Sequence, residues 1–233
     1  MSWLPTFVAL LAAYLVGSLS FAVITSRLMG LADPRSYGSG NPGATNVLRS
    51  GSKPAALATL ALDALKGFVP VLLVLVFGPR WGLGEGTAAF AGLAAFLGHL
   101  YPVFFGLKGG KGVATAAGVL MALNPGLAVA TLLSFAIVLA FSRYVSLAAI
   151  VGAAFAPFYQ ALVWGPGPVL LAIGIMSLLL VWRHEGNLRK LIAGTEHKLG
   201  QRAVAPLGAL PSPGKPRTGH GPHSKHGKHR KEH

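Results

Sequence analysis

The chain has 233 residues, of which 53% are hydrophobic and only 11% are charged, and its mean hydropathy is +0.59. Soluble domains carry roughly 25% charged residues, so this composition indicates a protein that crosses the membrane several times. The net charge of +14 does not indicate a nucleic-acid binder, because most Lys and Arg residues lie after Gly200 or in short loops between apolar segments. The chain has no cysteine, which excludes disulfides, thiolate nucleophiles and cysteine metal ligands.

Seven apolar segments predict transmembrane helices and an all-α, polytopic fold. They lie at about residues 3–28, 55–77, 87–107, 113–123, 127–141, 145–162 and 168–182. The first is expected to remain as a span, because it has neither the basic start nor the small-residue cleavage site of a signal peptide.

The fourth segment has 11 residues, whereas a full crossing needs about 20. Asn124-Pro125-Gly126 ends its apolar run. Either its helix starts inside the preceding loop at 108–112, or the fourth and fifth segments form a shallow hairpin.

The basic residues predict which side of the membrane each loop occupies. With seven crossings and the N-terminus outside, every Lys and Arg except Lys66 and Arg80 falls inside, as the positive-inside rule favours. The cytoplasmic regions are then the loops at 30–54, 108–112 and 142–144, and everything after residue 182. We expect residues 1–200 to form a membrane-embedded domain and the basic, His-rich residues 201–233 to form a disordered cytoplasmic tail.

The loop after the first apolar segment is rich in groups that bind phosphate. It reads Gly38-Ser-Gly-Asn-Pro-Gly-Ala-Thr-Asn-Val-Leu-Arg49. The side chains suited to hydrogen-bonding a phosphate or a polyol are Ser39, Asn41, Thr45, Asn46 and Arg49. It is not a Walker A loop, because no Gly-Lys-Ser/Thr follows. The alternative is a solvated connector made of turn-forming residues.

Two further polar clusters adjoin apolar segments. In Lys108-Gly-Gly-Lys-Gly112, two glycines between two lysines let the backbone approach a ligand closely. In Arg183-His-Glu-Gly-Asn187, His184 and Asn187 are three apart, so on a helix they share one face and can orient a hydroxyl or a phosphate oxygen. The alternatives are a positive-inside anchor for the former and a snorkelling arginine for the latter. On one face of the membrane, the three clusters would form a single anion site.

Three ionisable residues fall inside predicted spans. Asp63 and Lys66 are three apart in the second span, where opposite charges at this spacing favour a structural ion pair over a functional site. His99, in the third span, is interpreted as a hydrogen-bonded core histidine.

At these clusters the chain resembles the bacterial integral-membrane acyl-phosphate:glycerol-3-phosphate acyltransferases. The main matching segments are Gly38-Ser-Gly-Asn-Pro-Gly-Ala-Thr-Asn46, Gly106-Leu-Lys-Gly-Gly-Lys-Gly-Val-Ala-Thr115, and His184 to Asn187 followed by Leu191-Ile-Ala-Gly-Thr-Glu196. Three shorter segments match as well: Leu62-Asp-Ala-Leu-Lys-Gly67, Gly98-His-Leu-Tyr-Pro102 and Arg143-Tyr-Val-Ser146. The resemblance implies transfer of a fatty acyl group from acyl phosphate to the 1-hydroxyl of glycerol 3-phosphate. The implied products are 1-acylglycerol 3-phosphate (lysophosphatidate) and inorganic phosphate. This would be the first committed acylation of phospholipid synthesis, and it uses no metal and no cofactor.

The resemblance also implies which residues act. The positions that match substrate-binding or activating positions are Ser39, Arg49, Lys111, Ser146, His184 and Asn187, and all of them except Ser146 are expected to be catalytic. Together with the candidates read from the loops, the expected substrate-binding set is Ser39, Asn41, Thr45, Asn46, Arg49, Lys108, Gly109, Gly110, Lys111, Ser146, His184 and Asn187. The family often has Glu just before the matched Asn, where this chain has Gly186, so Glu185 is assigned no role.

The implied partners are glycerol 3-phosphate, acyl phosphate and the lipid bilayer, with the soluble enzyme that makes acyl phosphate as a candidate and with no nucleic acid. The implied location is the bacterial cytoplasmic membrane, with the active site facing the cytoplasm. The residues themselves leave the proton acceptor open between His184 and a phosphate oxygen of the donor.

Two other classes of function are a permease for organic phosphates and a non-catalytic lipid-binding scaffold. A transporter should offer polar residues to both faces, but the predicted outer loops carry little binding chemistry. The His-x4-Asp dyad of other acyltransferases is absent, because the positions five after His99, His184 and His197 are not Asp.

Overall fold

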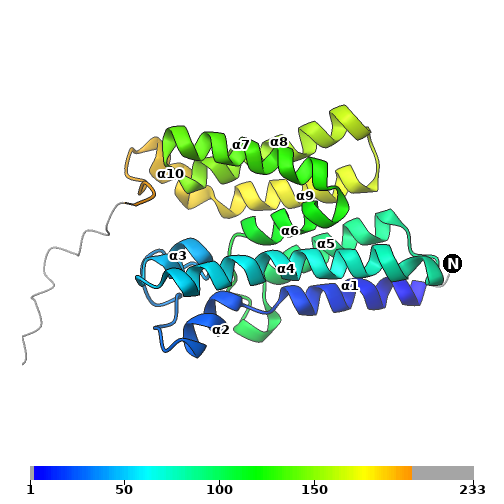
Figure 1. The fold of residues 1–233 in the computed structure, drawn as a ribbon, viewed down its shortest axis with the longest axis horizontal. Coiled ribbons are helices and arrows are strands. Elements are labelled where there is room, and N and C mark those ends of the chain that lie inside the picture. The colour runs from blue at the N-terminus through cyan, green and yellow to red at the C-terminus, as the bar shows by residue number, and fades with distance from the viewer. Residues whose placement is uncertain (1–2, 201–233) are drawn as a thin grey trace, which may run out of the picture. The chain divides into compact units, whose positions relative to one another are not determined.

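A computed structural model describes residues 3–200 of the chain. Within that range every regular element is a helix (Figure 1). In chain order the elements are α1 (Trp3–Gly17), α2 (Phe21–Leu28), α3 (Ala44–Leu48), α4 (Lys53–Phe77), the 3₁₀ turn η1 (Gly78–Trp81), α5 (Glu85–Leu100), the 3₁₀ turn η2 (Val103–Phe105), α6 (Val113–Leu123), α7 (Pro125–Ser142), α8 (Val145–Trp164), α9 (Pro168–Arg183) and α10 (Glu185–Ile192). The all-α prediction is confirmed, and the predicted tail at 201–233 lies outside the described residues.

Several helices have the length and composition of membrane spans. In the described part of the chain, four segments qualify by these two measures: Lys53–Trp81, Glu85–Phe105, Pro125–Ser142 and Val145–Trp164. The number rises to six if the bent pairs α1–α2 and α9–α10 each count as one span, and α6 is a shorter apolar helix. Large apolar side chains face outward, among them Leu133, Ile137 and Phe141 of α7, as expected of a surface that contacts lipid.

The predicted first span, 3–28, is not one continuous helix. Its two halves, α1 and α2, are bent by 42° about a break at residues 18–20. At the break, Nζ of Lys66 on α4 donates a hydrogen bond to the carbonyl of Leu19 (2.7 Å). A lysine from another helix thus satisfies a carbonyl that a continuous helix would bond internally, and hydropathy does not reveal such a contact.

The short fourth segment forms α6, which begins at Val113. A helix start inside the loop at 108–112 is therefore wrong, because Gly112 has φ of +85° and separates the loop from the helix. After α6, Asn124 caps α7 by accepting a hydrogen bond from the N–H of Leu127 (3.0 Å). Only Asn124 lies between the two helices, which pack against each other. The second alternative, a shallow hairpin, does not describe α7, because Pro125–Ser142 has the length and composition of a full span and only α6 is short.

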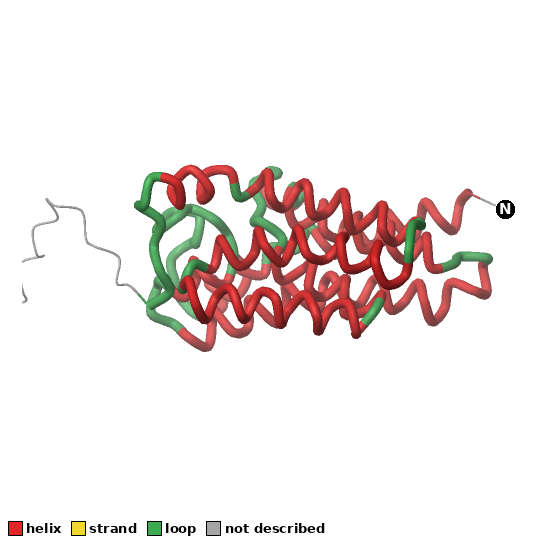
Figure 2. Tube along the Cα trace, turned by 90° about the horizontal axis from the view of Figure 1, so that it is seen from above, coloured by secondary structure: helices red, strands yellow, loops and turns green. Residues whose placement is uncertain are grey.

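The packing of the described helices places α6 between α4 and α5 on one side and α7 on the other (Figure 1). α1 packs on α5, and α8 packs on both α7 and α9. The core between them is apolar, with Phe96, Leu100 and Val119 fully buried. The main loops, from distant parts of the chain, lie together at one end of the helices (Figure 2).

The predicted intramembrane ion pair is present. Nζ of Lys66 lies 2.8 Å from Oδ1 of Asp63, and both side chains are buried. His99 of α5 is buried beside them, but its Nδ1 lies 3.7 Å from Oδ1 of Asp63. That distance is longer than a hydrogen bond, so the expected hydrogen bond of this core histidine is not formed at Nδ1.

Candidate active site at the loop end of the helices

Four segments meet at the loop end of the helices. We name them the first loop (Gly38–Arg49), the glycine turn (Lys108–Gly112), the junction (Arg183–Asn187) and the strap (residues 193–200). The carbonyl of Pro42 in the first loop lies against Gly110 of the glycine turn. From the junction, Nη2 of Arg183 donates to the carbonyls of Gly109 (3.0 Å) and Gly110 (3.2 Å). The three clusters predicted to share a site therefore adjoin one another.

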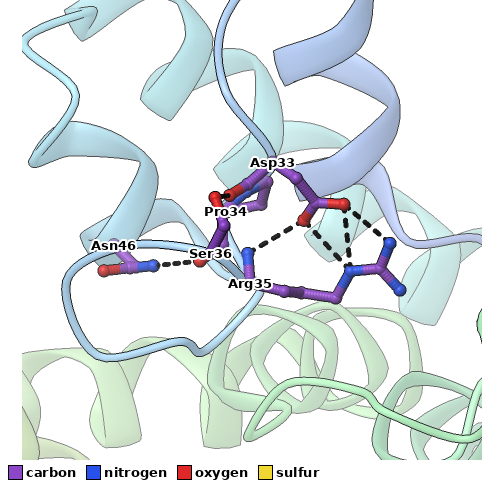
Figure 3. Close-up of polar contacts among 5 residues, drawn as sticks. All are labelled: Asp33, Pro34, Arg35, Ser36 and Asn46. Atoms are coloured by element: carbon purple, nitrogen blue, oxygen red, sulfur yellow. Dashed lines mark hydrogen bonds and ion pairs between the residues drawn. The ribbon is translucent and has the colours of Figure 1, made fainter.

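The approach to the first loop is held by an ion pair (Figure 3). Asp33 accepts hydrogen bonds from the backbone N–H of Arg35 (2.9 Å) and from its Nε (3.0 Å) and Nη2 (2.7 Å). These hydrogen bonds from the guanidinium hold the pKa of Asp33 below its usual range. Ser36 Oγ donates to the carbonyl of Asp33 (2.8 Å), which closes the turn.

Asn46, a predicted substrate-binding residue, is turned into the first loop. Its Nδ2 donates to the carbonyls of Pro34 (2.6 Å) and Tyr37 (3.2 Å), and its Oδ1 accepts from the N–H of Ser39 (3.0 Å). The bond to Pro34 is drawn in Figure 3. The side chain is buried, and both ends of its amide are used. In this structure Asn46 shapes the loop that presents Ser39.

The other predicted side chains of the first loop have unused hydrogen-bonding groups. Within the described residues, those of Ser39, Asn41, Thr45 and Arg49 form no side-chain hydrogen bond, and the same holds for Lys108 of the glycine turn. All are exposed except Asn41, which is half-buried. These groups are accessible to a ligand.

The glycine turn is pressed against the end of α5. The N–H of Gly110 donates to the carbonyl of His99 (3.2 Å), so this N–H is already used. A Cβ atom at Gly109 would overlap the His99 carbonyl, and one at Gly110 would overlap the His99 ring. Only glycine permits such close approach. With Arg183 on its other side, the turn has a defined position from which Lys111 projects.

A network of four polar side chains crosses the site. Nζ of Lys111 donates to Oδ1 of Asn187, and Nδ2 of Asn187 donates to Oε1 of Glu196 (2.7 Å). Ser146 Oγ donates to the same carboxylate oxygen (2.8 Å). Lys111, Ser146 and Asn187 were all predicted, whereas Glu196, which joins them, was not. The only sign of Glu196 in the sequence was its position at the end of the family-like segment Leu191–Glu196.

The charges around Lys111 converge from separate segments. Burial lowers the pKa of the Lys111 amine to about 8, although the carboxylate of Glu196 opposes this shift. The positive charges that lower it further are those of Arg183, Lys190 and Arg49. The first loop, the glycine turn and the junction therefore share one positive electrostatic field.

His184 lies in the junction, beyond the end of α9, and is only 3% exposed. Burial lowers its pKa to about 4, so the imidazole is neutral at pH 7. Its Nδ1 lies 2.8 Å from the carbonyl of Leu180, and in a neutral ring this nitrogen must donate to a carbonyl. Nε2 is then an unprotonated acceptor.

The strap is tied to the turn between α7 and α8, at the C-cap residue Arg143 of α7. The N–H of Leu199 donates to the carbonyl of Arg143 (2.8 Å), and Nη2 of Arg143 donates to the carbonyl of Leu199 (2.9 Å). These two bonds hold Glu196 over the site. Glu185, which was assigned no role, instead forms an exposed ion pair with Arg189 (2.5 Å).

An apolar cavity adjoins the polar site, between α6, α7, α8 and α9. Its lining includes Val113, at the start of α6, and Leu180, whose carbonyl holds His184. Other lining residues are Leu120, Phe135, Ile173 and Met176. Such a lining suits an alkyl chain. Among the described residues, no group of three or more His, Asp or Glu side chains is placed to hold a metal ion.

The sequence profile of the family described as "Glycerol-3-phosphate acyltransferase" matches residues 7–194. A glycerol-3-phosphate acyltransferase of Paraburkholderia xenovorans (strain LB400) is 61% identical over 202 residues, which are 87% of this chain and 94% of that protein. One of Ralstonia nicotianae is 57% identical over 197 residues, which are 84% and 95% of the two chains. The fold is similar to a crystal structure of PlsY (YgiH), an integral membrane glycerol 3-phosphate acyltransferase, in its glycerol 3-phosphate form. The TM-score is 0.78 at 40% identity, over 84% of this chain and 96% of that chain. Its lysophosphatidic acid form gives 0.77 at 39% identity over the same shares.

Proposed function

The chain belongs to the glycerol-3-phosphate acyltransferase family and is an integral membrane enzyme of that kind, and we propose that its acyl donor is acyl phosphate. In the proposed reaction the acyl group passes to the 1-hydroxyl of glycerol 3-phosphate, giving 1-acylglycerol 3-phosphate and inorganic phosphate. The sequence segments 38–46 and 106–115 support this donor, because they resemble the corresponding segments of the acyl-phosphate-dependent enzymes. The structures of PlsY with glycerol 3-phosphate and with lysophosphatidic acid support the acceptor and the product.

The observation that carries the proposal is the network of Lys111, Asn187, Glu196 and Ser146 within a field of positive charge. Each substrate brings a phosphate, which carries a charge of roughly −1.5 to −2 at pH 7. Two such groups repel each other strongly at close range unless cations lie beside them. We assign Lys111 and the exposed Arg49 to this task.

The proposed chemical step needs positioning more than activation, because the donor is already an activated acyl group. The oxygen of the 1-hydroxyl attacks the acyl carbonyl carbon and forms the new ester bond. The bond from this carbon to the phosphate oxygen breaks, and phosphate leaves with its electron pair. Lys111 and Arg49 stabilise the negative charge that develops on the carbonyl oxygen and the leaving phosphate.

The hydroxyl proton has two candidate acceptors. Nε2 of His184 is neutral and can accept a hydrogen bond from the attacking hydroxyl, but its pKa of about 4 makes it a weak base. The second pKa of a phosphate monoester is about 6, which is closer to the working pH and therefore better matched. We assign His184 to orienting the hydroxyl, and the departing phosphate to receiving the proton.

The remaining groups of the site have complementary roles. Ser39, at the exposed tip of the first loop, is assigned to a substrate phosphate. Ser146, Asn187 and Glu196 are assigned to the glycerol hydroxyls, because together they offer donors and an acceptor. The acyl chain is assigned to the apolar cavity, which begins at Val113, close to Lys111 in the chain.

We place the site at the cytoplasmic face of the bacterial inner membrane, with the N-terminus outside. The positive-inside rule supports this orientation, since the loop end carries the first loop, the glycine turn and the junction with their basic residues. Acyl phosphate made by a soluble enzyme would then reach the site from the cytoplasm.

The proposal is tested with purified protein in detergent, supplied with palmitoyl phosphate and glycerol 3-phosphate. Lysophosphatidate and inorganic phosphate should form in equal amounts, with no divalent metal added. Strict dependence on acyl-CoA or acyl carrier protein, or loss of activity in EDTA, would contradict it. Uptake of glycerol 3-phosphate into sealed vesicles without acylation would favour a permease, and binding without turnover would favour a scaffold.

A further inference from the structure

A buried ionic cluster lies in the helices behind the site and belongs to none of the roles above. Asp63 and Lys66 of α4 form an ion pair (2.8 Å), and His99 of α5 lies beside Asp63. The side chains of Asp63, Lys66 and His99 are 3%, 2% and 7% exposed. Oδ1 of Asp63 is held by the Lys66 ammonium, whereas Nδ1 of His99 has no hydrogen-bond partner among the described residues.

Such a cluster is not explained by stability. Removing two charges from water is costly, and replacing a buried ion pair by apolar residues of similar volume is often neutral or stabilising. Charged side chains inside a membrane are also costly, and those that are present usually have a functional role. The contacts at the two ends of the cluster indicate what that use is.

At one end the cluster holds the break between α1 and α2. Nζ of Lys66 donates to the carbonyl of Leu19 (2.7 Å), while Asp63 fixes the ammonium from the other side. The chain that follows α2 leads into the first loop, which carries Ser39 and Arg49. The direction in which α2 leaves α1 therefore depends on Lys66.

At the other end the cluster contacts the glycine turn. His99 accepts the N–H of Gly110 at its carbonyl (3.2 Å), and its ring leaves no space for a Cβ at Gly110. Lys111 follows directly and donates to Asn187. The His99 ring and carbonyl therefore fix where the turn from which Lys111 projects lies against α5.

We propose that Asp63, Lys66 and His99 are positioning residues that set the first loop and the glycine turn relative to each other. The cluster acts on substrate only through these two segments. The inference rests on the proposed roles of Arg49 and Lys111 at the phosphates. It predicts that the cluster can be removed with little loss of stability but with a clear loss of substrate binding and turnover.

The main test is the double variant Asp63→Leu/Lys66→Met, which removes both charges together and leaves no unpaired ion. We expect only a modest fall in the melting temperature in detergent, because the lost bond to the Leu19 carbonyl is offset by the removal of two buried charges. The KM for glycerol 3-phosphate should rise and kcat should fall, so that kcat/KM drops roughly 10- to 100-fold, the scale expected for misplaced binding groups. Binding of glycerol 3-phosphate without donor, measured by calorimetry, should weaken in parallel.

The matched control is Gln160→Leu on α8. Gln160 is buried and its Oε1 has no hydrogen-bond partner among the described residues, so the variant removes a buried polar side chain from a helix outside the cluster. Its kcat/KM should stay close to wild type. An equal loss in Gln160→Leu would show that general packing, and not this cluster, sets the activity.

Wild-type kcat/KM and wild-type binding in the folded double variant would overturn the inference. If the double variant does not insert into the membrane, His99→Leu is tested instead by the same kinetic and binding measurements. This variant removes the ring that contacts Gly110 and leaves the ion pair intact. The binding assay uses no acyl donor. A wrong donor assignment would therefore show in the wild-type reaction, whereas a wrong positioning role would show only as unchanged binding in the variants.

Discussion

The charge state of Lys111 should control the alkaline limb of the reaction. The amine has its pKa lowered to about 8 by burial and by neighbouring cations, and it binds phosphate only when protonated. Because the pKa is lowered, the useful charge is fully present well below pH 8 and is lost as the pH rises through 8. The parameter to follow is kcat/KM for glycerol 3-phosphate, which reports the ionisation of the free enzyme.

The expected size of the alkaline fall in kcat/KM follows from the pKa of about 8. Roughly nine tenths of the molecules carry the charge at pH 7, and about one tenth carry it at pH 9, so kcat/KM should fall about tenfold between the two. Lys111→Arg keeps its charge throughout this range and should abolish the alkaline fall, although its bulk beside Gly110 should lower the whole profile. Lys111→Ala should lose about 10²–10³-fold at pH 7, the scale for a single transition-state donor.

The assay measures lysophosphatidate formation from palmitoyl phosphate between pH 6 and 10, with the rate of donor hydrolysis without enzyme subtracted. Thermal shift at each pH shows that the protein stays folded. Lys53→Arg, at the exposed start of α4, is the control and should leave the profile unchanged. A wild-type profile that is flat to pH 10, or the same alkaline fall in Lys111→Arg, would refute the role of Lys111.

Glu196 accepts hydrogen bonds from Ser146 and Asn187, and bonds to a charged group contribute roughly 1.5–3 kcal/mol. Glu196→Gln should therefore lower kcat/KM about tenfold or more in steady-state kinetics, and an unchanged value would remove Glu196 from the site. Asn46→Ala leaves its three loop partners unpaired, which should reduce the free energy of unfolding by about 1–3 kcal/mol and raise the KM for glycerol 3-phosphate. Denaturation and kinetics on the same sample check both effects, and a KM equal to wild type would show that the loop does not need this residue. Reporters fused within 30–54 and at the C-terminus should both report cytoplasm, whereas an external signal at either place would reverse the proposed orientation.

The helices were predictable because a bilayer imposes a simple rule on sequence. A segment in lipid must be apolar and must bond its own backbone, so the segments at 145–162 and 168–182 match α8 and α9 within two residues. Local breaks were also readable, since Asn124 both ends α6 and caps α7. Hydropathy averages over many residues, however, and it missed the break at residues 18–20.

The three polar clusters were visible in the sequence alone, but their composition also fitted turn-forming connectors and positive-inside anchors. Which of these groups are available to a ligand was decided by the tertiary structure. Asn46 and Ser39 look equivalent in the amino-acid sequence of the first loop, yet Asn46 is buried and bonded to two carbonyls, whereas Ser39 is exposed.

The role of Glu196 depends entirely on the fold. Its carboxylate meets Ser146 from 50 residues earlier in the chain, and Asn187 meets Lys111 from 76 residues earlier. No periodicity or residue spacing in the sequence predicts a contact between residues so far apart in the chain. A hydrogen bond forms only when two groups come within about 3 Å, and helix packing around α6 brings these side chains to that distance.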